Sequence, residues 1–119
     1  MSLLSEFESY RARMNERILA ENHQPIKRFY SVDTLTYHDG ALDRKTKEML
    51  GLTASMVLRC DDCIKYHVLE CHKLGVTVKE FFDIFSVSLV VGGSIVVPHM
   101  RRAVEFLDEL EQTRKNQTA

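Results

Sequence analysis

The sequence predicts an all-α protein: a helical bundle of about six helices that forms a single domain over residues 1–119. Three observations predict this fold class. Apolar residues recur at helical spacing through most of the chain, and helix-capping signals precede several of these stretches. A length of 119 residues fits one domain, and 45% hydrophobic residues are enough for a substantial core.

Residues 1–41 are predicted to be an N-terminal helical segment. An amphipathic helix is defined by apolar residues at helical spacing, namely Leu3, Phe7, Tyr10, Met14 and Ile18. Pro25 should end it, because proline cannot continue the hydrogen-bond ladder of a helix. Residues 26–37 are ambiguous and are interpreted as a short helix that packs Phe29 and Tyr30, followed by a turn at 38–40.

Two helices are predicted between residues 43 and 75. Asp43 is a suitable N-cap for a helix from Arg44 to about Leu58. The second helix begins near Cys60 and ends at Gly75, a residue type that suits the left-handed position after a helix. Periodicity assigns six residues to the inner face of the first of these helices: Thr46, Met49, Leu50, Thr53, Met56 and Val57.

The C-terminal part is predicted to hold the remaining helices. A capping box at Thr77 and Glu80 predicts a helix that starts at Val78. The β-branched residues around Gly92-Gly93 would also suit a β-hairpin over residues 85–97. We favour two helices joined at the glycines, because a lone hairpin is only marginally stable. The last helix, with a polar tail expected to fray from Thr113, carries one apolar stripe: Met100, Ala103, Val104, Leu107 and Leu110.

Charge and hydropathy argue against nucleic-acid or membrane partners. Acidic and basic residues nearly balance at 17 and 16, and no basic patch or basic amphipathic helix is visible. The longest apolar run, residues 81–97, contains Asp83 and two glycines and only reaches the lower length limit for crossing a bilayer. The N-terminus has no features of a secretory signal, so we expect a cytoplasmic protein.

The stretch from Arg59 to His67 is the part of the sequence that indicates chemistry. It contains the pattern Cys60-x-x-Cys63-x-x-x-His67. On a helix, Cys63 and His67 lie about 40° apart on one face. Cys60 would lie at the helix N-terminus, where free backbone N–H groups and the helix dipole favour a thiolate. In a reducing compartment such a pair is more often catalytic or metal-binding than a permanent disulfide.

Metal binding is the weaker alternative for these residues. A closed zinc site usually needs a second pair of ligands elsewhere in the chain, and ligands from one helix rarely converge on a tetrahedron. We therefore expect neither a metal nor a cofactor. Cys71 is interpreted as a packed apolar residue, since about 12 Å of helix separates it from Cys63. His99 is assigned a surface or capping role, and Glu48 by itself would be an ordinary solvated residue.

Taken together, these motifs resemble the carboxymuconolactone decarboxylase family, and within it the alkylhydroperoxidase D-like branch. Glu48 lies twelve residues before Cys60, as in the signature of that branch. The family is all-helical and forms homo-oligomers, commonly trimers or hexamers, so the resemblance also favours helices over the hairpin. It covers about residues 42–110 and is carried by Leu42–Glu48, the Cys60–His67 pattern, Gly75-Val76-Thr77 with Glu80, and Gly92-Gly93.

The resemblance implies a thiol-dependent peroxidase or disulfide reductase. True lactone decarboxylases of the family lack the cysteine pair, which argues against decarboxylation here. Cys63 would attack a small-molecule hydroperoxide and Cys60 would form the disulfide, although the helix-terminus argument alone favours Cys60 as the nucleophile. Glu48 and His67 would move protons, and a dithiol or a protein reductant would restore the thiols.

The two residues between the cysteines depart from what a thiolate needs. Asp61 and Asp62 suit a helix N-terminus, but their negative charge disfavours a neighbouring thiolate. We therefore expect weaker reactivity towards peroxide than in typical members of the branch. The alternative function is a non-catalytic homo-oligomeric scaffold, or a small-ligand-binding protein, that keeps the same fold.

Overall fold

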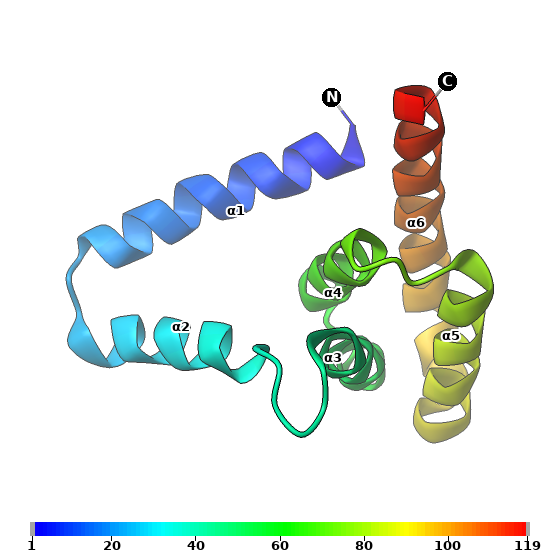
Figure 1. Cartoon of the computed structure of the whole chain (residues 1–119), viewed down its shortest axis with the longest axis horizontal. Helices are drawn as coiled ribbons and strands as arrows, with labels where there is room; N and C mark the ends of the chain where they lie inside the picture. Colours follow the sequence, from blue (N-terminus) through cyan, green and yellow to red (C-terminus); the bar gives the residue numbers. More distant parts are fainter. Residues whose placement is uncertain (1, 119) are drawn as a thin grey trace.

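The structure is a computed structural model that describes residues 2–118. Helices joined by short loops are the only regular secondary structure of these residues (Figure 1). The predicted all-α fold is therefore confirmed, and the hairpin alternative for residues 85–97 is wrong. The elements in chain order are α1 (Leu3–Ala20), α2 (Gln24–Thr36), α3 (Arg44–Leu58), α4 (Asp61–Lys73), α5 (Val78–Gly92), the short 3-10 helix η1 (Ser94–Val96) and α6 (Val97–Thr118).

Local capping sets the helix boundaries near the site. The Asp43 side chain accepts a hydrogen bond from the Thr46 amide at 2.8 Å, which fixes the start of α3. Thr77 and Glu80 form the predicted capping box at the start of α5. Gly75 follows α4 with φ +89°, a left-handed conformation that glycine adopts without steric cost. The predicted bounds of these helices are confirmed.

The core lies among α3, α4, α5 and α6. Helix α3 packs against α4 and α5, and α4 also packs against α6. Helix α1 adds Phe7, whose ring meets that of Phe106 edge-on with centroids 5.8 Å apart. The largest fully buried apolar side chains are Phe81, Phe85, Phe106, Leu52, Met56, Ile64 and Leu107. The predicted apolar stripe of the last helix is confirmed, since its residues are buried or pack against this core.

The predicted inner face of α3 is only partly confirmed. Leu50 is 55% exposed, and the fully buried side chains of this helix are Glu48, Leu52 and Met56. These residues are spaced four apart and face the junction with α4 and α5. Met56 belongs to the predicted set and Met49 packs against the core, whereas Glu48 and Leu52 were not predicted. Thr46, Met49, Leu50 and Thr53 border a shallow hollow beside α5.

Helices α1 and α2 form an arm at one side of the molecule (Figure 1). The N-terminus of α1 is held by Glu109 of α6, whose carboxylate accepts hydrogen bonds from the Leu3 and Leu4 amides at 3.1 and 2.7 Å. Helix α2 confirms the predicted second helix but buries none of its residues. Phe29 is 70% exposed, so its predicted packing is wrong within the chain, and Tyr30 donates a hydrogen bond to Asn15.

The end of α6 differs from the prediction, whereas the division of residues 81–97 into helices at the glycines confirms it. Helix α6 continues to Thr118, so the fraying expected from Thr113 is not seen in the described part of the chain. Residues 81–97 are divided between α5, η1 and the start of α6, with a break at Gly93. None of the helices formed by residues 2–118 is long and apolar enough to cross a membrane.

Candidate active site

The cysteine pair lies where α3 ends and α4 begins. Arg59 adopts a left-handed conformation with φ +59° and turns the chain, and the Cys60 amide then donates to the Ser55 carbonyl at 3.1 Å. Cys60 is the N-cap of α4, and its sulfur accepts a hydrogen bond from the Cys63 amide at 3.2 Å. The two residues form a disulfide, with Cys63 exposed and Cys60 partly buried. The expected position of Cys60 at a helix N-terminus is confirmed.

Glu48 of α3 and His67 of α4 form a buried pair. Glu48 lies in α3 and is fully buried, so it is not the ordinary solvated residue that its local sequence alone would suggest. Its Oε2 lies 2.8 Å from Nδ1 of His67, which is also buried and lies on α4 one turn after Cys63. Within residues 2–118, Oε1 of Glu48 has no hydrogen-bond partner. A buried acid with one free oxygen, paired with an imidazole, can accept or relay a proton.

Two tyrosine rings and a glycine enclose the His67 ring. The ring centroids of Tyr37 and Tyr66 lie 5.5 and 5.2 Å from that of His67. Burial, with smaller contributions from the Glu48 and Asp33 charges, raises the pKa of Tyr37. Its hydroxyl therefore stays protonated at neutral pH and remains a hydrogen-bond donor. The sequence motif did not identify either tyrosine.

Gly51 provides the space that the His67 ring occupies. A Cβ atom at position 51 would lie 2.6 Å from Cε1 and 2.9 Å from Nε2 of His67, and 2.9 Å from the Tyr37 hydroxyl. Such contacts are too short for any real Cβ, so a side chain here would displace the imidazole or the tyrosine. A glycine inside a predicted helix, three residues after Glu48, was the available sequence signal for this close approach.

We expect Gly51→Ala to disturb the Glu48–His67 pair. The change should destabilise the fold by about 1–3 kcal/mol through overpacking, although alanine is the better helix former. Chemical denaturation measures the stability, and the chemical shifts of the His67 ring report its displacement. Gly40→Ala is the matched control, because its added Cβ would meet only the flexible end of Lys47 at 3.3 Å. Unchanged His67 shifts in Gly51→Ala would contradict the assigned close approach.

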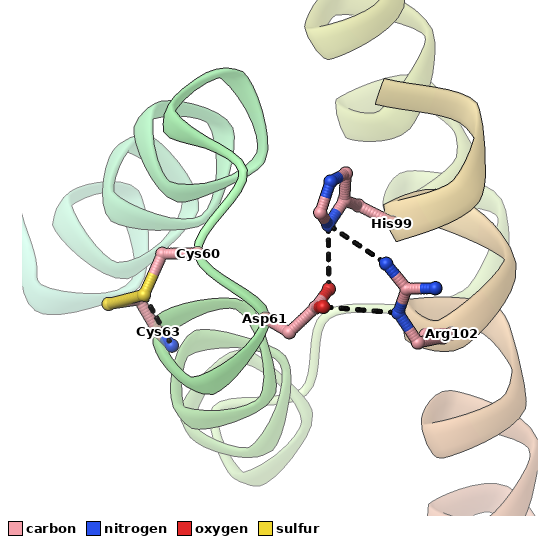
Figure 2. A network of polar contacts seen from close by, with 5 residues as sticks. All are labelled: Cys60, Asp61, Cys63, His99 and Arg102. Atoms are coloured by element: carbon pink, nitrogen blue, oxygen red, sulfur yellow. Dashed lines mark hydrogen bonds and ion pairs between the residues drawn. A yellow bond between two sulfur atoms is a disulfide. The ribbon is translucent and has the colours of Figure 1, made fainter. Parts of the chain in front are cut away.

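The two aspartates between the cysteines both have basic partners. Asp61 Oδ1 lies 2.8 Å from His99 Nδ1, and Arg102 Nε donates a hydrogen bond to Asp61 Oδ2 at 3.1 Å (Figure 2). Burial raises the pKa of the Asp61 carboxyl, but the hydrogen bonds and charges of His99 and Arg102 outweigh burial and lower that pKa overall. The Asp61 carboxylate is therefore ionised at neutral pH, and its negative charge is offset by these basic partners.

Asp62 is paired with Arg11 of α1 at 3.5 Å. The same guanidinium lies 4.5 Å from the centroid of the Tyr66 ring, in a cation–π arrangement. A hollow of about 420 Å³ opens beside this contact and is bordered by Asp62, Tyr66 and residues of α1 and α2. The arm formed by α1 and α2 therefore reaches the edge of the cysteine motif.

In the part of the chain that the structure describes, the side chains of Cys71, the remaining thiol, and of the neighbouring His72 form no hydrogen bond with the residues described above. Cys71 is completely buried, and burial raises the pKa of its thiol to about 12, which fits its interpretation as a packed apolar residue. His72 Nε2 lies 2.6 Å from Glu111 Oε2 of α6, and His72 follows Cys63 by nine residues on α4. Among residues 2–118, no three His, Cys, Asp or Glu side chains are grouped so that they could hold a metal ion.

Comparisons with known proteins place this chain in a family. The sequence model of the carboxymuconolactone decarboxylase family matches residues 26–106. This match starts earlier than the resemblance read from the motifs, which began near Leu42. The chain therefore belongs to the carboxymuconolactone decarboxylase family.

Two crystal structures of protein TM1620 from Thermotoga maritima are similar to this chain. One has a TM-score of 0.91 at 50% identity and covers 93% of this chain and 97% of the other. The second, with a TM-score of 0.90 at 47% identity, covers 96% and 97% of the two chains. It is described as a carboxymuconolactone decarboxylase family protein that is a candidate for involvement in an antioxidative response.

More distant relatives share the same fold or sequence region. A family protein from Legionella pneumophila, lpg0406 in its apo form, has a TM-score of 0.80 at 25% identity and covers 88% of this chain and 94% of its own. An uncharacterised protein encoded in the cox locus of Paracoccus denitrificans is 26% identical over 83 residues, which are 70% of this chain and 75% of that protein.

Proposed function

We propose that the chain is a thiol-dependent peroxidase or disulfide reductase whose Cys60–Cys63 pair alternates between dithiol and disulfide. The observation that carries the proposal is the joint placement of two residue pairs. The disulfide lies at the N-terminus of α4, and His67, one turn after Cys63 on the same helix, is paired with the buried Glu48 of α3. The antioxidative description of one similar Thermotoga protein supports it.

In the proposed cycle, the Cys63 thiolate attacks one oxygen of a hydroperoxide. The O–O bond breaks, an alcohol leaves after it takes up a proton, and Cys63 becomes a sulfenic acid. The Cys60 thiol then attacks the sulfenic sulfur, which releases water and forms the disulfide. An external dithiol, free or on a protein, returns two electrons and two protons and is itself oxidised to a disulfide.

The greater exposure of Cys63 supports its role as the attacking thiol, since the hydroperoxide must reach it from solution. His67 would accept the thiol proton directly or through water, and Glu48 would orient the imidazole and stabilise its positive charge. The proposal includes a cytoplasmic location, because regeneration of the dithiol needs a reducing compartment.

Turnover with a hydroperoxide tests the proposal. The purified protein is mixed with cumene hydroperoxide and dithiothreitol, and the consumption of peroxide and the formation of the alcohol are followed. We expect one alcohol for each dithiothreitol oxidised, at a rate proportional to protein concentration. Peroxide consumption no faster than without protein would contradict the peroxidase activity and favour the non-catalytic scaffold or ligand-binding alternative.

We also propose that the chain forms a homo-oligomer through the apolar face of α2, as a trimer or hexamer. Four apolar side chains of this helix are exposed, namely Ile26, Phe29, Val32 and Leu35. Burial of such a side chain contributes about 1.5–3 kcal/mol, so a second copy that covers this face would gain considerable stability. An exposed apolar face of this kind is a common mark of protein–protein contact.

Light scattering should therefore give a multiple of 13.8 kDa at micromolar concentration. Phe29→Glu should shift the protein towards smaller species, because it would bury a carboxylate in the interface. Thr34→Glu is the matched control, since it adds the same group at an exposed position on the side of α2 away from Phe29 and Val32. A wild-type mass equal to one chain would refute the oligomer.

A further inference from the structure

The cluster of Asp61, His99 and Arg102 connects the cysteine motif to α6. Asp61 is the first residue of α4, whereas His99 and Arg102 lie in the first turns of α6, 38 and 41 residues further along the chain. Figure 2 shows the Asp61 carboxylate turned towards α6, with the disulfide on the other side of the α4 start. Arg102 Nη2 also lies 3.2 Å from His99 Nδ1, so the three side chains are mutually in contact.

The negative charge of Asp61 is unfavourable for a thiolate of the cysteine pair. A thiolate at the start of α4 gains from the helix dipole, but a free carboxylate one residue away opposes it by a similar amount. Asp62 has its own basic partner in Arg11. His99 and Arg102 are the basic partners of Asp61. They also keep its carboxylate away from the first backbone amides of α4. One of those amides, that of Cys63, donates to the Cys60 sulfur.

We propose that His99 and Arg102 are positioning residues for the Cys60–Cys63 couple, because they hold the Asp61 carboxylate on the α6 side and offset its charge. Reduction of the disulfide takes two electrons and two protons from a dithiol, which becomes a disulfide in turn. At a pH where one of the new thiols ionises, any group that stabilises the thiolate favours the reduced form. The inference rests on the proposed redox role of the pair, but its readouts need no hydroperoxide.

The test measures the thiol pKa of the reduced full-length protein, from the thiolate absorbance in the ultraviolet, in four variants and the wild type. His99→Gln combined with Arg102→Gln should raise the pKa of the more acidic thiol by about 0.2–0.7 unit, the range for loss of a partly exposed charge pair. Asp61→Asn should lower that pKa, because the two basic groups remain and the carboxylate is gone. Arg102→Lys should keep most of the wild-type value. Arg101→Gln, which removes an exposed neighbouring charge, is the matched control and should leave the pKa unchanged.

Equilibration with a reference dithiol, at a pH where the thiolate is populated, gives an independent readout. The double variant should favour the disulfide by about two- to fivefold, where tenfold would correspond to about 30 mV for a two-electron couple. Asp61→Asn should shift the equilibrium the other way. If Asp61→Asn and the double variant shift both quantities in the same direction, or neither shifts them, the positioning role is refuted. Peroxide turnover does not enter either measurement, so failure of the proposed peroxidase activity would be seen separately.

Discussion

Cys63→Ser is expected to abolish turnover of hydroperoxide, whereas Cys60→Ser should permit one oxidation and no further cycle. Serine at position 63 removes the attacking sulfur of the proposed cycle. Without Cys60, the sulfenic acid on Cys63 has no neighbour in the motif with which to form a disulfide, so it accumulates until an external thiol reacts with it. Peroxide consumption measures turnover, and mass spectrometry after trapping with dimedone detects the sulfenic acid.

Cys71→Ala is the matched control for the two cysteine variants. It removes the third thiol of the chain, which is buried and whose pKa is raised to about 12, so turnover should persist. Trapping of a sulfenic acid on Cys60 in the Cys63→Ser protein would reverse the assignment of the two cysteines. That result would favour the simple helix-terminus argument for Cys60 as the nucleophile.

Glu48→Gln and His67→Gln should each slow the reaction of Cys63 with hydroperoxide by about ten- to a thousandfold, which overlaps the usual range of about a hundred- to ten-thousandfold for general acid–base help. A free cysteine with a pKa near ~8.5 is only a few per cent thiolate at neutral pH. A helix terminus contributes about 0.3–1 kcal/mol, less than the ~1.4 kcal/mol of one pKa unit. We therefore expect the Glu48–His67 pair, whose Oε2 and Nδ1 atoms lie 2.8 Å apart, to take up the proton of the Cys63 thiol.

Stopped-flow mixing of the reduced protein with hydroperoxide measures this effect in a single turnover. The chain offers a matched control in its second histidine–glutamate pair, since His72 of α4 contacts Glu111 of α6 at 2.6 Å. His72→Gln and Glu111→Gln should react at the wild-type rate. Wild-type rates in both Glu48→Gln and His67→Gln would exclude the relay and make the cysteines ligands or bystanders.

Local signals in the sequence predicted the helices, because the capping residues act over three or four positions. Asp43, Thr77 and Gly75 fixed boundaries that the structure reproduces. The spacing from Glu48 to His67 likewise singled out residues that the fold brings together. These features depend on neighbours along one helix or on a recurring family pattern, so sequence was sufficient for them.

The sequence did not predict the contacts between segments that lie far apart along the chain. Which residues of α3 are buried depends on where α4 and α5 pack against it, and this packing buries Glu48. The role of Gly51 depends on the position of the His67 ring. His99 was assigned a surface or capping role because nothing local links it to Asp61, 38 residues earlier. The charge of the two aspartates was anticipated, but their basic partners were not.

Titration of free thiols before and after one equivalent of hydroperoxide is the most direct test of the proposed redox cycle. The fully reduced protein is treated under denaturing conditions with a thiol reagent, so that buried Cys71 is counted as well. We expect hydroperoxide to remove the Cys60 and Cys63 thiols together, to leave Cys71, and to be fully reversed by a dithiol. An unchanged thiol count after exposure to hydroperoxide would contradict the redox role of the pair.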